Sequence, residues 1–406
     1  MNAVRPLKFV LVGTYSSLNK GDRLMQEVMA EQLRQRFKSC KVSLLSPFPA
    51  LDRPAYSGIK VEKASRRNLP YSTILVVLLI LLIPFKSLRK KLISSIAELN
   101  IIDEADLVID LSGDMLTEDY GPLIALSHSF TLILPLLLQS KYCVVAQSIG
   151  KFKYLKPLYR YLLNKAQFVS ARESITAGYL HSIAVSNVVE VSDLGFLLKP
   201  DNKHVDVPYF KALGRKVVGI SPSALLGVKF AKWADGPSLP DQLRLFLKKL
   251  VSEGFYIVFV PHVAVPKGKS DFDVALEISA DISNDCTVLR DDLSPAAMKE
   301  LVGKLDYMVA FRMHAAIAAL DQSVPTVLVS YSHKSIGLAG KLGIEELVIP
   351  CDEDFYKNIE TTFAKLLGEP EMFGSEYSKR LNAVRVEATK NIDLIESVFE
   401  GARNDN

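Results

Sequence analysis

The sequence predicts an α/β protein built from two doubly wound domains of parallel strands. Short runs rich in Val, Ile and Leu alternate with longer amphipathic stretches, which is the pattern of parallel strands joined by crossover helices. A polar, proline-containing passage interrupts this rhythm once, and the rhythm then starts again. The chain has 406 residues, of which 49% are hydrophobic and 23% charged, so it is long enough for two separate cores.

The strand-like runs divide into two series. In the first half we expect strands at residues 8–12, 41–45, 106–111, 142–146, 167–171 and 188–191. In the second half we expect strands at residues 216–220, 256–260, 306–311, 326–330 and 347–349. The polar passage covers residues 199–215, which predicts an N-terminal domain at 1–205 and a C-terminal domain at 206–406. A charged amphipathic helix is expected at 376–400.

Composition limits the kinds of binding partner and the cellular compartment that we expect. The formal net charge of +4 is spread along the chain, which argues against a nucleic-acid-binding stripe and suits small anionic molecules. The four cysteines form neither a C-x-x-C pair nor a Cys/His cluster with metal-ligand spacing. The apolar run at residues 9–12 is too short for a signal-peptide core. We therefore expect a cytoplasmic protein with free thiols and no bound metal.

One apolar segment, at 74–85, stands out in the first domain. Residues 74–83 form an unbroken aliphatic run, and basic residues follow at positions 86, 89, 90 and 91. The run is about half as long as the roughly 20 residues that a helix needs to cross a bilayer. Burial in the core and contact with a membrane surface both stay open. The basic cluster favours peripheral contact of residues 74–91 with anionic lipids at the inner face of the plasma membrane.

Polar motifs follow the expected strands of the first domain. Open α/β sheets bind ligands at the carboxyl ends of their strands, so two such domains facing each other would form a cleft lined by these motifs. The first strand leads into a loop with Asn19, Gly21 and Asp22 at a helix N-terminus, where backbone N–H groups hold anions or sugar hydroxyls. The alternative is that Asp22 only caps its own helix.

Two further strands of this domain end in polar side chains. Ser112, Gly113 and Asp114 follow the third strand, and Asp114 can serve as an acid or base if burial or a neighbour raises its pKa. The alternative is a tight turn with Asp and Gly in their usual places. Gln147 and Ser148 follow the next strand and are expected to line the same edge.

Arg172 follows the fifth strand and supplies a positive charge at this edge. A guanidinium in this position can hold a phosphate or carboxylate through two parallel hydrogen bonds. The alternative is an ion pair with Glu173 or another acid.

The sharpest motif is Arg312-Met313-His314, between the strand expected at 306–311 and a small-residue helix expected at 315–320. Arg312 supplies a permanent charge for an anionic ligand, and His314 can exchange a proton near neutral pH. An arginine and a histidine at one strand-to-helix turn favour a functional site over an isolated structural histidine. Tyr331 and Lys334 follow the next strand and add a hydroxyl and a cation.

Taken together, these motifs resemble those of the polysaccharide pyruvyl transferase family. The residues that carry the resemblance are Asn19, Gly21, Asp22, Ser112, Gly113, Asp114, Gln147, Ser148, Ile149, Gly150, Arg172, Glu173, Ser174, Arg312, Met313, His314, Tyr331, Ser332, His333 and Lys334. Each motif alone is weak, but their order, spacing and strand-end placement cover most of the chain. Met313 stands where the family usually has leucine, and Lys151 where proline is common.

The resemblance implies two Rossmann-like domains of the GT-B type facing a cleft. It also implies transfer of the enolpyruvyl group of phosphoenolpyruvate, as co-substrate and without another cofactor, onto a sugar of an exopolysaccharide or of its lipid-linked precursor. The products would be a pyruvate ketal and phosphate. The implied donor-binding residues are Arg172, Arg312, Met313 and Lys334. The implied acceptor or cleft-lining residues are Asn19, Gly21, Asp22, Ser112, Gly113, Gln147, Ser148 and Tyr331. His314 and Asp114 suit the two proton transfers, and which is the acid and which the base stays open.

Two alternatives remain beside this interpretation. A glycosyltransferase using a nucleotide sugar would share the two-domain architecture, because a fold does not determine a reaction. A non-catalytic, membrane-associated binding protein in the assembly of envelope polysaccharide would also keep the fold. The intact Arg312-Met313-His314 motif favours an enzyme over the latter.

Overall fold

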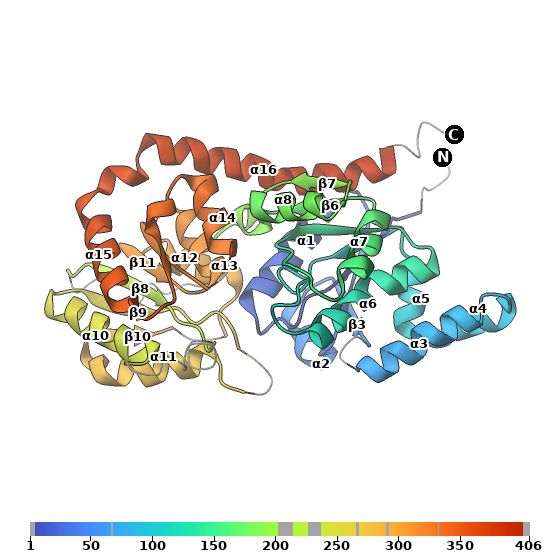
Figure 1. The fold of residues 1–406 in the computed structure, drawn as a ribbon, viewed down its shortest axis with the longest axis horizontal. Helices are drawn as coiled ribbons and strands as arrows, with labels where there is room; N and C mark the ends of the chain where they lie inside the picture. The colour runs from blue at the N-terminus through green and yellow to red at the C-terminus, as the bar shows by residue number, and fades with distance from the viewer. Residues whose placement is uncertain are drawn as a thin grey trace. The chain divides into compact units, whose positions relative to one another are not determined.

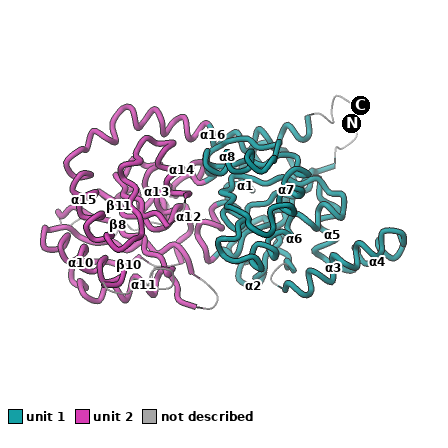
Figure 2. Tube along the Cα trace, in the orientation of Figure 1, with its two compact units in different colours: residues 1–17, 25–194, 387–406 teal, residues 18–24, 195–386 magenta. Residues whose placement is uncertain are grey.

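A computed structural model describes residues 5–65, 68–201, 214–225, 237–264, 268–289, 292–331 and 333–400. The chain divides into two compact units, coloured separately in Figure 2. Unit 1 consists of residues 1–17, 25–194 and 387–406, and unit 2 of residues 18–24 and 195–386. The boundary expected between residues 205 and 206 lies outside the described residues.

Unit 1 contains a seven-stranded parallel sheet with the strand order β3-β2-β1-β4-β5-β6-β7. The strands are β1 (Lys8–Val12), β2 (Lys41–Ser46), β3 (Lys60–Lys63), β4 (Leu107–Asp110), β5 (Tyr142–Gln147), β6 (Val169–Ala171) and β7 (Val188–Glu190). All residues of β4 and β5 are buried, as expected for central parallel strands covered on both faces. The order reverses between β1 and β4, which are neighbours in the sheet.

Helices connect the strands of unit 1 and cover the sheet (Figure 1). They are α1 (Lys20–Arg36), α2 (Pro49–Asp52), α3 (Leu69–Leu81), α4 (Lys86–Ser95), α5 (Ala97–Asp103), α6 (Pro122–Leu138), α7 (Lys156–Lys165) and α8 (Ser174–Ser182). Proline at the first turn of α3, α6 and α7 suits a helix start, because the N–H that proline lacks would have no helical partner there. No helix among the described residues is both long and apolar enough to cross a membrane.

Unit 2 repeats this design with a six-stranded parallel sheet in the order β10-β9-β8-β11-β12-β13. The strands are β8 (Val217–Ser221), β9 (Tyr256–Phe259), β10 (Cys286–Val288), β11 (Tyr307–Ala310), β12 (Thr326–Ser330) and β13 (Val348–Pro350). The helices are α10 (Leu239–Ser252), α11 (Asp271–Ser279), α12 (Pro295–Val302), α13 (Met313–Leu320), α14 (His333–Leu342), α15 (Phe355–Gly368) and the first part of α16 (Ser375–Glu400), whose residues from 387 onward belong to unit 1. The order reverses between β8 and β11, where Ser221 lies opposite Ala310.

Two parallel, doubly wound sheets confirm the expected α/β class. In such sheets the two connections leaving the point of reversal go to opposite faces, so the carboxyl ends of the strands there form a crevice. Each unit is therefore expected to bind ligands at its reversal point, which is β1/β4 in unit 1 and β8/β11 in unit 2.

Candidate active site

The reversal point of unit 2 is built around an ion pair between Arg312 and Asp271. Arg312 follows β11 and precedes α13; its Nε and Nη2 donate to the Asp271 carboxylate at 2.9 and 2.6 Å. Asp271 is fully buried and also accepts from the backbone N–H groups of Ala224 and Val263, each at 2.9 Å. Burial disfavours the charge of Arg312, but Asp271 outweighs this effect and raises the pKa of Arg312. The guanidinium is thus charged and held at the edge of the sheet.

His314 lies one residue beyond the start of α13 and packs against Gly21. A Cβ atom on Gly21 would lie 2.2 Å from His314 Nδ1, so only glycine fits there. The loop that carries Gly21 belongs to unit 2, and two further contacts hold it against the rest of that unit. Asn19 forms a β-bridge with Val263, and the backbone N–H of Lys20 donates to the carbonyl of His262 at 3.0 Å. The Asn19-x-Gly21 motif therefore packs beside the catalytic candidate.

His262 is buried close to the positive charges of this site. Its side chain is buried, and Nδ1 has no hydrogen-bond partner among the described residues. Burial, followed by the nearby charges of Lys20, His314 and Arg312, lowers the pKa of His262 well below its usual 6.5. His262 is therefore neutral at pH 7 in an environment of concentrated positive charge. Such an environment suits an anionic ligand.

Tyr331 and Lys334 extend this cluster along the same edge. Tyr331 follows β12 and contributes to the raised pKa of Arg312 through a hydrogen bond. Lys334, in the first turn of α14, is 9% exposed, and its Nζ lies 5.8 Å from the centre of the Tyr331 ring. We call the set Lys20, His262, Arg312, His314, Tyr331 and Lys334 the basic cluster. Among the candidates predicted from sequence, Met313 and Asp22 are half-buried in the first turns of α13 and α1.

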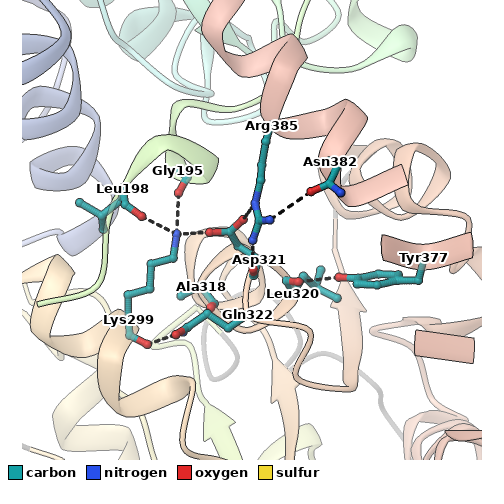
Figure 3. Close-up of polar contacts among 10 residues, drawn as sticks. All are labelled: Gly195, Leu198, Lys299, Ala318, Leu320, Asp321, Gln322, Tyr377, Asn382 and Arg385. Carbon is teal, nitrogen blue, oxygen red and sulfur yellow. Dashed lines mark hydrogen bonds and ion pairs between the residues drawn. The ribbon is translucent and has the colours of Figure 1, made fainter. Parts of the chain in front are cut away.

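The far end of α13 is anchored by charged contacts (Figure 3). Asp321 caps the helix and accepts from Arg385 Nε at 2.7 Å and from Lys299 Nζ. Lys299 also donates to the carbonyls of Gly195 and Leu198 at 3.2 and 2.7 Å. Burial lowers the pKa of Lys299, and Asp321 opposes that shift. These bonds fix α13, and with it the position of His314.

The strand ends of unit 1 hold a different set of contacts, centred on Arg172. Its Nη1 donates to Asp193 and its Nε to the Ser148 hydroxyl, both at 2.8 Å. The side chains of Arg172 and Asp193 are each 2% exposed. The backbone N–H of Ser148 donates to the carbonyl of Gly113 at 2.9 Å. The guanidinium therefore binds together the ends of three strands.

A second group of contacts in unit 1 surrounds the buried Asp110. Its carboxylate accepts from the backbone N–H of Ser112 at 2.9 Å, from Gln147 Nε2 at 2.5 Å and from the Thr131 hydroxyl. Two buried oxygens at this point, Ser112 Oγ and Gln147 Oε1, have no hydrogen-bond partner among the described residues. The reversal point of unit 1 therefore offers unused hydrogen-bonding oxygens.

Asp114 lies two residues beyond Ser112 and is half-buried. It accepts a hydrogen bond from the Tyr120 hydroxyl at 2.6 Å. Gly113, beside it, has φ +69°, a left-handed conformation that glycine adopts without strain. The Ser112-Gly113-Asp114 segment is thus a turn that presents a carboxylate.

The structure brings the sequence candidates together in two sets. Unit 2 gathers Asn19, Gly21, Asp22, Arg312, Met313, His314, Tyr331 and Lys334, and unit 1 gathers Ser112, Gly113, Asp114, Gln147, Ser148 and Arg172. Sequence reasoning missed Lys20, although it lies inside the Asn19-x-Gly21 motif. It also missed Asp271, which no motif marks because its partner Arg312 is 41 residues away. In the parts of the chain that are described, no three His, Cys, Asp or Glu side chains are grouped as metal ligands.

Comparison with known proteins agrees with the fold and identifies the family. A UDP-N-acetylglucosamine 2-epimerase from Neisseria meningitidis, solved with UDP-N-acetylglucosamine, is similar in fold, with a TM-score of 0.60, 13% identity and coverage of 97% of this chain and 100% of that chain. UGT2 of Phytolacca americana is also similar, with a TM-score of 0.53, 11% identity and coverage of 97% and 99%. Both support a two-domain, Rossmann-like, GT-B-like fold.

Sequence comparison carries the assignment further. The amylovoran biosynthesis protein AmsJ of Erwinia amylovora is 19% identical over 91% of this chain and 98% of its own length. The family model for polysaccharide pyruvyl transferases matches residues 19–333, a span that begins at Asn19 and includes Arg312 and His314. The chain belongs to the polysaccharide pyruvyl transferase family.

Proposed function

We propose that this protein transfers the enolpyruvyl group of phosphoenolpyruvate onto two hydroxyls of a sugar in an exopolysaccharide or its precursor. The products are a pyruvate ketal and phosphate. The observation that carries the proposal is the basic cluster at the reversal point of unit 2, where burial and then the charges of Lys20, His314 and Arg312 lower the pKa of His262. The polysaccharide context is supported by the family and by the relative AmsJ, an amylovoran biosynthesis protein.

The basic cluster matches the charges of the donor. Phosphoenolpyruvate carries a carboxylate and a phosphate, and cations or N–H groups near both anions would hold it. Arg312 and Lys334 are the proposed ligands for these anions, joined by Lys20. Met313, at the same turn, is proposed to pack against the donor.

Arg172 was also expected to bind the donor, and its contacts lead us to propose a different role. Both contacts of its guanidinium, to Asp193 and Ser148, are buried and internal to unit 1. A guanidinium released from Asp193 would leave a buried carboxylate without its partner. We propose that Arg172 holds the strand ends that present Ser148 and Gly113.

The chemistry assigns a proton-transfer role to His314. Protonation of the donor's methylene carbon creates an electron-poor centre at the neighbouring carbon, which one sugar hydroxyl attacks. A second hydroxyl then displaces phosphate, so one acceptor proton replaces the proton used and the other leaves on phosphate. This sequence needs an acid at the methylene and a base at the hydroxyl. We propose His314 and Asp114 for these two tasks, with Asp114 assigned from the sequence motif.

The acceptor is proposed to meet the reversal point of unit 1. Ser112 Oγ and Gln147 Oε1 are buried there without partners among the described residues, and sugar hydroxyls can donate to such oxygens. The positive charge of Arg172 at this edge is offset by the carboxylate of Asp193.

One experiment tests the proposal as a whole. The purified protein is incubated with phosphoenolpyruvate and a panel of glycan intermediates, and both phosphate release and the mass of the glycan are measured. We expect phosphate release that depends on the glycan, together with a product carrying one pyruvyl ketal. A parallel incubation with nucleotide sugars serves as the control. Glycosyl transfer from a nucleotide sugar, without phosphate release from phosphoenolpyruvate, would contradict the proposal.

A further inference from the structure

The surface formed by α3 and α4 is unlike the rest of unit 1. From Lys63 to Ala97 the sequence contains no aspartate or glutamate, and residues 69–85 contain no charged side chain at all. In Figure 1 the two helices extend beyond the helices that cover the sheet. Helices on a protein surface normally turn a polar face to water.

One side of α3 accounts for its attachment to unit 1. Ser72, Leu75 and Leu79 are buried at helical spacing, and Leu75 and Leu79 belong to the same apolar core as Leu132 and Leu134 of α6. This stripe is the ordinary inward face of a packed helix. It leaves the opposite side of α3 without a covering element of unit 1.

That opposite side is apolar and exposed. Tyr71, Ile74, Val77, Leu78, Ile80 and Leu81 of α3 are between 38% and 62% exposed. Ile83, Phe85 and Leu88, in the turn and in α4, are 57%, 57% and 55% exposed. These nine residues all lie between positions 71 and 88, and we call them the apolar face. Contiguous exposed apolar surfaces of this kind mark sites of interaction.

Exposed lysines lie next to the apolar face. Lys86, Lys90 and Lys91 of α4 are exposed, while Arg89 turns inward and donates to the carbonyl of Leu137 in α6. That bond fixes the orientation of α4, so the three lysines and the apolar face have a defined arrangement. Lysines beside inserted apolar residues attract anionic lipid headgroups.

A cavity adjoins the apolar face at the start of α3. It has a volume of about 540 Å³ and is lined in part by Ser65, Asn68, Tyr71 and Glu98. Both oxygens of Glu98 accept from the backbone N–H of Ser65, at 3.1 and 3.0 Å. The cavity, which also has apolar lining residues such as Pro47 and Ile96, thus shares Tyr71 with the apolar face.

We propose that the apolar face and Lys86, Lys90 and Lys91 bind the surface of an anionic lipid bilayer. At about 1.5 Å per residue, the 13 residues of α3 are about 20 Å long, too short for a bilayer core of about 30 Å. The helix therefore lies in the interface. A second copy of this chain fits less well, because a twofold contact through this face would bring two sets of these lysines together, and residues 63–97 contain no acidic side chain to pair with them.

Vesicle binding tests this proposal independently of the transferase activity. Sedimentation with phosphatidylcholine vesicles is compared with sedimentation with vesicles that also contain phosphatidylglycerol. We expect binding that increases with phosphatidylglycerol and decreases with salt. The triple variant Ile74→Ser, Ile80→Ser, Phe85→Ser is expected to weaken binding at least tenfold. Its matched control, Leu123→Ser with Ile175→Ser, changes exposed apolar residues elsewhere in unit 1 and is expected to bind as wild type.

A second pair of variants tests the charges. Lys86→Gln, Lys90→Gln and Lys91→Gln together are expected to remove the preference for phosphatidylglycerol. The control, Lys156→Gln, Arg160→Gln and Lys165→Gln, removes the same number of exposed charges from α7 and is expected to keep it. Equal binding by the two triple charge variants would overturn the proposal, as would wild-type protein that ignores vesicles of both compositions.

Discussion

The carboxyl ends of the two sheets carry equally polar sequences but hold opposite kinds of chemistry. At the strand ends of unit 1, Arg172 is neutralised by Asp193, and the buried polar atoms without partners among the described residues include the oxygens of Ser112 and Gln147. In unit 2, the charges of Lys20, Arg312 and His314 gather around His262. One edge suits neutral hydroxyl groups, and the other suits an anion.

This difference shows that the partner of a charged residue matters as much as its position. Arg172 and Arg312 both follow a buried strand, and both form an ion pair with a buried aspartate. Asp271 accepts from Arg312 and from two backbone N–H groups, and the charges of Lys20 and His314 lie near the neighbouring His262. Asp193 accepts from Arg172, whose guanidinium also donates to Ser148 within unit 1. The same residue type is thus part of the scaffold in one unit and part of a candidate binding site in the other.

The largest expected effect is a loss of catalytic rate, and it tests the proposed proton-transfer role of His314 in unit 2. Replacing His314 by Gln removes a group that exchanges protons, so kcat/KM for phosphate release is expected to fall by about 10²–10⁴. The midpoint of thermal unfolding should change little, because the imidazole packs against Gly21 rather than into the core. The control is His181→Gln at an exposed position of α8. Equal activity of the two variants would remove His314 from the reaction.

The variant Arg172→Met tests the structural role of Arg172 in unit 1. This change leaves Asp193 buried without its guanidinium, and we expect the free energy of unfolding to fall by about 3–5 kcal/mol. Urea unfolding, followed by circular dichroism, measures the loss. Recovery of stability in the double variant with Asp193→Leu would show that the unpaired charge is the cause. A stable single variant would mean that the ion pair contributes little.

A steric change at Gly21 tests the position of His314. Gly21→Ala places a methyl group 2.2 Å from the present position of His314 Nδ1, so the imidazole must move. Displacement of a catalytic group by about 1 Å can cost about 10²-fold in rate. Gly178→Ala is the matched control, because that glycine also lies in a helix and has nothing within 4 Å of its added Cβ. A Gly21→Ala enzyme with wild-type kcat/KM would contradict the packing.

The smallest expected effect concerns His262 and pH. Its native pKa lies below 6.5, so the unfolded chain binds more protons than the native chain at acidic pH. Stability is therefore full above pH 6.5 and falls as pH decreases below it. Between pH 6.5 and 5 this group removes up to about 2 kcal/mol. Urea unfolding of His262→Asn should show a weaker dependence on pH over this range, and an unchanged dependence would exclude His262 as the cause.

Sequence patterning predicted the central strands and two of the four edge strands, β7 and β13, but missed the other two. The expected strands at 8–12 and 326–330 coincide with β1 and β12, because parallel strands that are buried over nearly their whole length read as continuous apolar runs. β3 and β10 were not predicted. They are short edge strands, with the sequences Lys-Val-Glu-Lys and Cys-Thr-Val, and lack such a run. Hydrophobic pattern alone cannot mark them.

The candidate site was predictable where a motif is local and not where partners are distant in sequence. Arg312 and His314 are marked by one strand-to-helix turn. The packing of Gly21 on His314 could not be read from sequence, because the loop after β1 groups with unit 2. The pairing of Arg172 with Asp193 rather than with Glu173 depends likewise on the fold, since Glu173 turns to the backbone of Thr176 at the start of α8.

The most direct test of the central claim is calorimetric titration of phosphoenolpyruvate into wild type, Arg312→Lys and Arg172→Lys. Both variants keep the charge and lose the guanidinium fork, so they form a matched pair. We predict that Arg312→Lys weakens phosphoenolpyruvate binding at least tenfold, whereas Arg172→Lys leaves it within about twofold of wild type. Weaker binding by Arg172→Lys together with wild-type affinity in Arg312→Lys would contradict the assignment of the anion site to unit 2.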